Sequence, residues 1–513
     1  MLYFGLIKNK ISSLSTEYKI ICGLAVLPIF ALLLVSPDSY IYDLWRREDS
    51  AWFFMCGKAW MNGYVPYVDF ADSKGPLLWL IYGIGYLFSN HTFVGVFWIS
   101  CIFYAITYIY TYRTAKVLLN GNINLAAMAS LLMTIFYFNP IIHYEIRAED
   151  FNLTFFTLSL FHVSRALWGS QSIKSLKNAS IAIGISMGAT MLIKYNATAM
   201  IGFLALPVAW RAIKEGVFFH AFVRVLLGAS IVVVPFLCYF LLQGNFAAFV
   251  SEYFCNTMST LDNLLIDELI HMTINNSPIF LFGVLATWRM AKYLKCYRYF
   301  PLLAFVVFYG VILMNAHWAY YYNSLNCLMI FAVVVVIKLF NIRKASKKML
   351  ISSSAFILVF IFIANLFTRY HYDVIFAYES TKRNNYYEYA YVISRVKNPT
   401  IIYYNTWCGP ELGMPAGALP GCKYWAKQNG ATWEMMKEQV LAIKEKKSDF
   451  VVVHKVFPAD SAFVAHQGYH YVPLSESNNL RLILFSKEKP VLPPSHFRMD
   501  GVDVLLKSGL DNF

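Results

Sequence analysis

The chain has 513 residues, of which 58% are hydrophobic, 18% are aromatic and only 14% are charged. Soluble domains carry about 25% charged and about 45–50% apolar residues, so this composition and a mean hydropathy of +0.50 exclude an ordinary soluble protein. The net charge of +14 does not indicate nucleic acid as a partner, because the basic residues lie in short runs between apolar segments, as in membrane proteins.

Apolar stretches follow one another along most of the chain. A helix of about 17–25 apolar residues spans a bilayer, and the sequence contains eleven such segments: 20–36, 92–112, 123–142, 151–166, 178–194, 196–212, 222–242, 278–294, 299–315, 320–340 and 349–367. The first segment ends without a cleavage pattern, so we interpret it as a retained signal anchor. The run 77–88 is too short to cross the membrane and is predicted to be a half-helix.

The first loop after the anchor, 37–76, is long, acidic and aromatic. Trp52, Met55, Ala59 and Trp60 have helical spacing, which predicts a helix lying in the membrane interface. Charged residues lie on both sides of this predicted helix: Arg46, Arg47, Glu48 and Asp49 before it, and Asp69, Asp72 and Lys74 after it.

A second concentration of charge, HYEIRAEDFNL at 143–153, lies between the third and fourth predicted spans. Glu145, Arg147, Glu149 and Asp150 crowd the start of a helix, where acids are favoured and where Asp150 is a candidate cap. Lys194 lies between two closely joined spans. A cation beside the hydrocarbon is costly and tends to mark a functional site.

The loops are charged unequally on the two sides of the membrane. If the N terminus is inside, only six basic residues fall in the outer loops and several times as many fall in the inner ones. This asymmetry favours an odd number of spans and a C-terminal segment outside the cytoplasm. We therefore expect a polytopic α-helical transmembrane domain over 1–368, with the long first outer loop 37–76.

The C-terminal segment, 369–513, has a different pattern. Strand-like runs at 400–406, 449–455 and 480–486 flank a helical pattern at 433–447, which predicts a small extracytoplasmic α/β domain. It contains Cys408 and Cys422, the two cysteines farthest from the apolar segments. A disulfide and two free thiols are both compatible with this pattern, and no Cys or His spacing predicts a zinc site.

Acidic residues concentrate in the outer loops. The transmembrane part places thirteen there, against Glu17 and Glu215 in the inner loops. The few outer cations lie beside these acids in the same two loops and at Lys194. We interpret the pattern as a cavity that holds a phosphate between cations with a carboxylate nearby.

The run 49–88 resembles the first outer loop of GT-C-fold integral-membrane glycosyltransferases, the glycosyltransferase family 39-like group that includes protein O-mannosyltransferases and lipid A aminoarabinose transferases. The resemblance rests on an acid after the first span, a Gly-x-x-Pro-Tyr-x-Asp segment from Gly63 to Asp69 and a Lys-x-Pro-Leu segment from Lys74 to Leu77. It continues through RAED at 147–150, Lys194, the stretch 316–325 and the tail. Gly75 stands where many relatives have proline, which leaves the subfamily open.

The resemblance implies a polyprenyl-phosphate sugar as donor, a lipid or glycan acceptor at the outer face, and inversion at the anomeric carbon. A phosphate leaving group needs cations rather than a general acid, and the acceptor hydroxyl needs a base. No cofactor is expected, and a divalent metal at Asp69 and Asp72 is the less favoured alternative to hydrated acids. A bacterial inner membrane is the expected location.

The candidate site residues have three roles. Asp49 is the candidate base, with Asp150 or Glu149 second; Lys74, Arg147 and Lys194 are candidates for holding the phosphate, assisted by Arg46 or Arg47; and His317, Tyr321 and Asp72 are candidates for acceptor or sugar binding. Each has a structural alternative: a solvated acid or helix cap, a lysine reaching the headgroups, an ion-paired arginine, a helix-end lysine, an interfacial histidine, or a tyrosine of the aromatic belt.

A flippase or other transporter of lipid-linked glycans is the rival interpretation of the whole chain. A transporter is expected to show inverted repeats and broken helices near the membrane midplane. The sequence shows no internal repeat, and its ionisable residues concentrate at one face. A noncatalytic scaffold is a third alternative, but it leaves the charges of the first loop unexplained.

Overall fold

The computed structural model describes residues 15–36, 39, 48–139, 145–169, 172–255, 277–313, 319–342, 346–366, 380–406, 410–427, 432–473, 481–499 and 502–505. The chain divides into two compact units, and each is assembled from separate stretches of the sequence. The first contains Met1–Ser36, Ser100–Pro235 and Leu264–Thr368, and the second contains Pro37–Ile99, Phe236–Asn263 and Arg369–Phe513.

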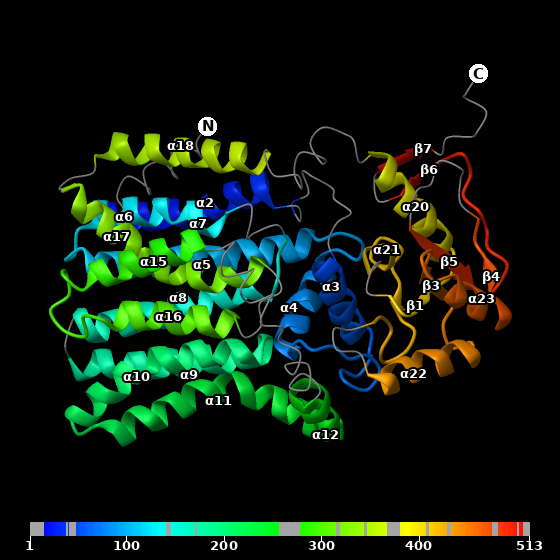
Figure 1. The fold of residues 1–513 in the computed structure, drawn as a ribbon, viewed down its shortest axis with the longest axis horizontal. Helices are drawn as coiled ribbons and strands as arrows, with labels where there is room; N and C mark the ends of the chain where they lie inside the picture. Colours follow the sequence, from blue (N-terminus) through cyan, green and yellow to red (C-terminus); the bar gives the residue numbers. More distant parts are fainter. Residues whose placement is uncertain are drawn as a thin grey trace, which may run out of the picture. The chain divides into compact units, whose positions relative to one another are not determined.

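The first unit is a bundle of helices that lie side by side with their axes roughly aligned (Figure 1). In chain order they are α2 (Thr16–Val35), α5 (Val94–Leu118), α6 (Ile123–Leu132), α7 (Thr134–Tyr137), α8 (Ala148–Trp168), α9 (Ile173–Ile193), η1 (Tyr195–Ala197), α10 (Thr198–Lys214), α11 (Phe218–Leu242), α15 (Ser277–Met290), α16 (Phe300–Leu313), η4 (Ala319–Leu328), α17 (Met329–Leu339) and α18 (Lys347–Leu366). One end each of α5 and α11 belongs to the second unit. Ser15, Asn122 and Ser172 begin three of these helices, because their side chains accept a first-turn backbone N–H.

Helices occupy all the predicted spans. Among the described residues, six helices are long and apolar enough to cross a membrane: Thr16–Val35, Val94–Leu118, Ile173–Ile193, Tyr195–Lys214, Phe218–Leu242 and Tyr320–Leu339. Most of the other predicted spans contain shorter apolar helices. A polytopic helical membrane protein is therefore confirmed, while the number of eleven spans stays a prediction.

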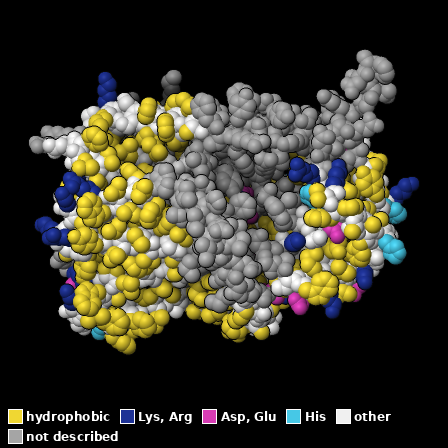
Figure 2. All heavy atoms as spheres, viewed as in Figure 1, with side chains coloured by type: hydrophobic (Ala, Val, Ile, Leu, Met, Phe, Trp, Pro, Cys, Tyr) yellow, Lys and Arg dark blue, Asp and Glu magenta, His cyan; other side chains and the backbone are white. Residues whose placement is uncertain are grey.

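The surface of the bundle is apolar. Hydrophobic side chains cover much of its visible face, and Lys and Arg gather at one end of the helices (Figure 2). Leu206, Trp210, Ile231 and Phe356 are each more than half exposed. Soluble proteins rarely expose apolar surface this extensive, so the bundle surface is suited to contact lipid.

The first outer loop forms two short helices in the second unit, α3 (Glu48–Met61) and α4 (Pro76–Phe88). Pro76 occupies the first turn of α4, directly after Gly75, which is a favoured way to begin a helix. The helices approach so closely at Gly57 and Gly83 that a Cβ on Gly57 would lie 2.4 Å from the backbone nitrogen of Gly83. The predicted half-helix is thus α4, of 13 residues.

The C-terminal segment contains a five-stranded sheet in the order β2-β1-β3-β5-β4. The strands are β1 (Thr400–Tyr403), β2 (Leu419–Pro420), β3 (Phe450–His454), β4 (His470–Tyr471) and β5 (Leu482–Ser486). The helices of this segment are α20 (Ser380–Ser394), α21 (Pro410–Gly413), α22 (Trp433–Lys444) and α23 (Pro458–His466), and β6 (His496–Met499) and β7 (Val502–Leu505) form a separate hairpin. β1 pairs in parallel with β2 and β3, whereas β5 runs antiparallel to β3 and β4. The predicted runs at 400–406, 433–447, 449–455 and 480–486 are confirmed as β1, α22, β3 and β5.

Helix α3 is confirmed, but its apolar stripe contacts protein. The rings of Trp52 and Trp425 lie 4.8 Å apart between centroids, and the Met55 sulfur lies against Gly413. Trp60 donates a hydrogen bond of 2.9 Å to the Tyr239 hydroxyl. The interpretation of this stripe as a face in the membrane interface is therefore wrong for Trp52 and Met55, because the C-terminal segment covers them.

A second connection ties the C-terminal segment to α12 (Phe246–Phe249) and the π-helix η2 (Val250–Cys255), in the same unit. The Glu252 carboxylate accepts hydrogen bonds from Lys423 Nζ at 2.6 Å and from the Tyr424 hydroxyl at 2.8 Å. Cys422 precedes this pair, while Cys408 lies outside the described residues, so a disulfide between them stays a prediction.

Candidate functional site

Asp150 is fixed at the start of α8 in the first unit. Its Oδ2 accepts the backbone N–H of Arg147 at 2.8 Å, which confirms the expected cap. Its Oδ1 accepts the Tyr104 hydroxyl at 2.5 Å and the Asn323 amide at 3.1 Å. With both oxygens occupied, this buried carboxylate is better suited to hold three segments together than to take a proton.

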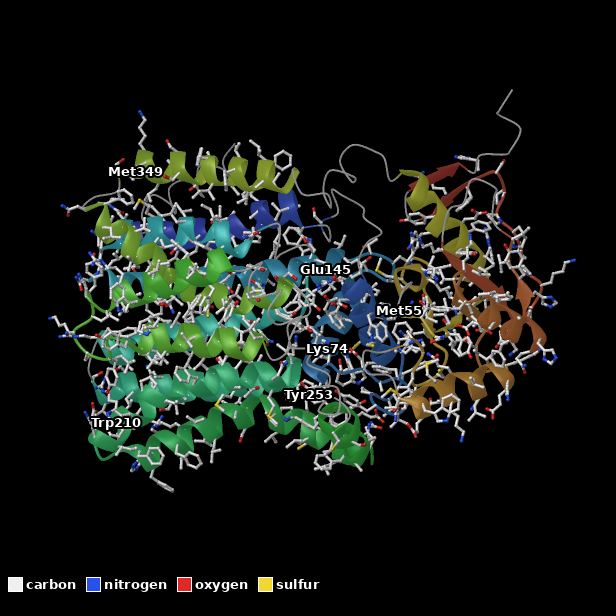
Figure 3. The ribbon with its side chains drawn as sticks, in the orientation of Figure 1. Met55, Lys74, Glu145, Trp210, Tyr253 and Met349 are labelled. Carbon is white, nitrogen blue, oxygen red and sulfur yellow. The ribbon has the colours of Figure 1, made fainter. Side chains whose placement is uncertain are left out.

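Arg147 lies in the same turn. Its guanidinium is hydrogen-bonded to Glu145 and lies 3.8 Å from the centroid of the Tyr320 ring. Figure 3 labels Glu145. Both charged side chains are buried, and a buried ion pair of this kind holds its arginine in one orientation. The expected pairing of Arg147 with a neighbouring acid is present.

Lys194 forms the other ion pair of this region. It is the residue that ends α9, and its Nζ lies 2.6 Å from Glu149 Oε1 and 3.6 Å from the centroid of the Tyr321 ring. The lysine side chain is 13% exposed and the glutamate side chain is 5% exposed. Lysine has three hydrogens to donate, and Glu149 is the acid with which it pairs among the described residues.

A small, open pocket lies beside this pair, entirely within the first unit. Its charged and polar lining comes from Glu149, Asn152, Lys194, Asn196, Tyr321 and Ser324, and its apolar lining comes from Ala197, Met200, Val311 and Ile312. A pocket with an apolar wall and a few polar groups is the usual form of a small-molecule site. Three predicted residues, Glu149, Lys194 and Tyr321, thus line one pocket.

In the second unit, Asp72 and Lys74 lie on the segment between α3 and α4. Asp72 Oδ1 accepts the backbone N–H of Ser73 at 2.6 Å, and Lys74 Nζ donates to Ser73 Oγ at 3.1 Å. Burial raises the pKa of Asp72, while the charge of Lys74 opposes that rise and the charge of Asp49 adds to it. Asp49, Asp72 and Lys74 are therefore close enough to interact electrostatically, and Figure 3 labels Lys74.

Asp69 is exposed, and its Oδ2 accepts the backbone N–H of Val65 at 2.6 Å. Within the described ranges, no three His, Cys, Asp or Glu side chains gather in a way that could hold a metal ion. The expectation that the protein needs no cofactor stays a prediction.

Three candidates, Arg46, Arg47 and His317, lie outside the described residues. Sequence reasoning assigned no role to Tyr104, Asn323 and Asn152, although Asn152 lies in the stretch 143–153 and Asn323 in the stretch 316–325. Their only signal was a polar side chain inside a predicted span, and that signal does not show which partner it meets.

The structure defines a class of protein: a polytopic helical membrane protein with ion pairs at the first turn of α8 and at the end of α9. The fold is similar to that of ArnT from Cupriavidus metallidurans. The structure of ArnT bound to undecaprenyl phosphate has a TM-score of 0.60 at 9% identity over 93% of this chain and 99% of that one. The apo state of ArnT has a TM-score of 0.59 at 11% identity, over 92% and 98%.

Residues 73–239 match the family model of dolichyl-phosphate-mannose-protein mannosyltransferases. The matched stretch includes Lys74, Arg147, Glu149, Asp150 and Lys194. A more distant likeness is to the Archaeoglobus fulgidus oligosaccharyltransferase tethered with an acceptor peptide, with a TM-score of 0.45 at 12% identity over 92% of this chain and 74% of that one. Among proteins of curated function, none matches the sequence. The resemblance to GT-C-fold membrane glycosyltransferases is confirmed.

Proposed function

We propose that this protein transfers a sugar from a polyprenyl-phosphate donor to a lipid or glycan acceptor at the outer face of the membrane. The rival function is transport of the same lipid-linked donor across the membrane.

 The anomeric carbon is inverted in this reaction. The observation that carries the proposal is the largely buried Lys194–Glu149 pair on the wall of an open pocket, within the stretch that matches the mannosyltransferase model.

A cation in such a pocket suits a phosphate leaving group. When the bond between the sugar and the phosphate breaks, negative charge grows on the phosphate oxygens, and a fixed cation in a partly dry site stabilises that charge. Lys194 has hydrogens left to donate while it is bonded to Glu149. We assign Lys194 to the donor phosphate, with Lys74 and Arg147 as further candidates.

The acceptor hydroxyl requires a base, and we assign this role to Asp49. The acceptor oxygen attacks the anomeric carbon from the side opposite the phosphate, the bond from that carbon to the phosphate oxygen breaks, and polyprenyl phosphate leaves. The hydroxyl proton passes to the carboxylate. Asp49 is half-buried at the start of α3, whereas both oxygens of Asp150 already accept hydrogen bonds.

The test is sugar transfer by purified protein from polyprenyl-phosphate sugars to a lipid extract. We expect Asp49→Asn to slow transfer by about 10²–10⁴-fold, which is the usual contribution of a positioned base. Asp69→Asn is the matched control, because Asp69 is exposed in the same loop and should leave the rate unchanged. A folded Asp49→Asn protein with the normal rate contradicts the assignment of the base.

The same preparation distinguishes transfer from transport. In proteoliposomes, a glycosyltransferase makes a new glycosidic bond, while a flippase moves the lipid-linked sugar across the bilayer and leaves it intact. Movement of the donor without any new bond would favour the flippase and contradict the proposal.

A further inference from the structure

The pocket beside Lys194 contains a buried acceptor that the proposed reaction does not use. Asn152 lies on α8, three residues after Glu149 and therefore on the same side of the helix. It is 1% exposed and lines the pocket. Its Oδ1 is buried, and no hydrogen bond reaches it from any residue with described coordinates. Buried polar atoms without a partner are rare and call for an explanation.

Local rearrangement does not satisfy this oxygen. The buried hydroxyls of Ser159 and Ser164 on the same helix also have no assigned partner, but a serine hydroxyl can rotate to donate to a carbonyl one turn earlier. An amide oxygen only accepts, and the neighbouring backbone N–H groups inside a helix are already engaged. Since Asn152 lines the pocket, we consider a molecule that occupies the pocket as the source of this donor.

The residue that carries this acceptor lines the pocket together with a cation. Lys194 and Asn152 line the same space, and Met200, Val311 and Ile312 supply apolar wall. A sugar phosphate combines the complementary groups, because its anionic phosphate is attached to a ring that carries hydroxyl or amino donors. A lipid phosphate without a sugar has only the first of these groups.

We propose that Asn152 is a specificity-determining residue whose Oδ1 accepts a hydrogen bond from a hydroxyl or amine of the donor sugar. The proposal rests on the assignment of Lys194 to the donor phosphate. It predicts that the pocket distinguishes the sugar-bearing lipid from the bare lipid phosphate, since a site built to pair with a hydroxyl loses affinity when one partner is removed.

The test measures the binding of two probes to the full-length protein: undecaprenyl phosphate, and a panel of undecaprenyl-phosphate hexoses and aminohexoses. Asn152→Leu has almost the same shape but lacks the acceptor. We expect it to weaken the preferred sugar-bearing probe by about tenfold or more, and to change undecaprenyl phosphate binding by less than about twofold. Ser159→Ala, which removes a buried hydroxyl that does not line the pocket, is the control and should change neither affinity.

A second readout separates this role from a packing role. Removing an unpaired buried acceptor should leave the melting temperature of the ligand-free protein unchanged or raise it, whereas losing a structural contact lowers it. Asn152→Asp keeps an acceptor oxygen and should retain more of the sugar preference than Asn152→Leu.

The outcomes distinguish the two proposals. Wild-type protein that binds none of the probes contradicts the donor assignment and the subsite together. Wild-type protein that binds undecaprenyl phosphate, with Asn152→Leu weakening every probe equally or none of them, contradicts only the subsite. A wild-type protein that binds no member of the panel more tightly than undecaprenyl phosphate also overturns the subsite.

Discussion

Lys194 and Glu149 have to be considered together, because each is the charged partner of the other in a largely buried place. Lys194→Met leaves the Glu149 carboxylate without its cation, and breaking a buried pair in this way typically costs about 3–5 kcal/mol of stability. The double variant Lys194→Met/Glu149→Leu removes both charges, so we expect it to recover most of that loss. Thermal unfolding in detergent measures the difference.

Binding separates stability from function in the same variants. Because the double variant lacks the cation, we expect it to fold but to bind undecaprenyl phosphate at least about tenfold more weakly than wild type. Lys194→Arg, which keeps the charge, is the control for binding. If the double variant binds with wild-type affinity, the phosphate is held elsewhere.

Lys58 on α3 makes stability depend on pH. Its side chain is buried against the Tyr86 ring, with Nζ 5.7 Å from the ring centroid, and burial lowers the pKa of this lysine to about 8. Between pH 8 and about 10.5 the unfolded chain therefore binds more protons at this position than the folded protein does. The free energy of unfolding therefore rises with pH across that window. Below pH 8 the lysine is charged in both states, and the folded protein bears the full cost of burying the charge.

Lys58→Met removes this cost. We expect the variant to be more stable than wild type at pH 7 by an amount on the order of 2–3 kcal/mol, and the gap to narrow as the pH approaches 10. Melting temperatures of both proteins at pH 7 and pH 9.5 test this. A gap that does not change with pH would show that Lys58 does not titrate as described.

The sequence predicted which residues belong to the candidate site, but it did not predict all of their contacts. Charge and spacing identified the acids and bases of 145–150 and Lys194, and the cap formed by Asp150 follows from its place at a helix start. The contacts of Asp150 with Tyr104 and Asn323 bridge 46 and 173 residues, respectively. Those contacts depend on which helices pack together, and helix periodicity within one segment does not encode that.

At the scale of elements, the contact of α3 with α4 depends on two glycines. A methyl group on Gly57 would lie 2.4 Å from the backbone of Gly83, which cannot move aside as a side chain can. We expect Gly57→Ala to lower stability by about 1–3 kcal/mol, since overpacking forces the helices apart. Gly202→Ala is the matched control, because nothing lies within 4 Å of a Cβ at that helical position.

The measurement is thermal unfolding of the two alanine variants beside wild type. Alanine favours a helix over glycine by up to about 1 kcal/mol, so the control should be neutral or slightly stabilised. Equal effects of the two substitutions would show that the approach of α3 to α4 is looser than described.

The sequence predicted where helices and strands form, because both follow local patterns of apolar residues. Apolar runs predicted the helices of the bundle, and alternating apolar residues predicted β1, β3 and β5. The partner of the α3 stripe was not predicted. Trp52 and Met55 have the same apolar character whether they face lipid or another part of the chain, and the partners Trp425 and Gly413 lie more than 350 residues away.

At the scale of the whole molecule, the second compact unit combines the first outer loop with the C-terminal segment. The sequence suggested a division at about residue 368, and that division stays a prediction for independent folding. In the structure, Pro37–Ile99 instead belongs to the same compact unit as Arg369–Phe513. Such a grouping follows from contacts distant in sequence, which composition along the chain does not reveal.

A truncation after residue 368 tests this grouping. Cys56 lies on α3 with no exposed surface, and burial raises the pKa of its thiol, so maleimide should not label it in the intact protein. In a variant with Cys56 as the sole cysteine, we expect truncation to expose the thiol and to speed labelling by at least tenfold. Cys255 as the sole cysteine is the control, because it is already exposed and lies outside the predicted spans.

Unchanged labelling of Cys56 after truncation would contradict the grouping. The first outer loop would then be folded without the C-terminal segment, and Trp425 would be a dispensable cover for Trp52.

The stacking of Trp52 on Trp425 has a consequence for how the protein is made. The ribosome completes the loop early, but the residues that cover it emerge some 370 residues later, which at about 5–20 residues per second is a delay of roughly 20–75 s. During that interval the aromatic surface of the nascent loop has no partner from its own chain. Assembly of this protein should therefore depend on whatever shields nascent chains during synthesis, and a premature stop codon near the 3′ end of the message should harm the earliest loop as much as the missing tail.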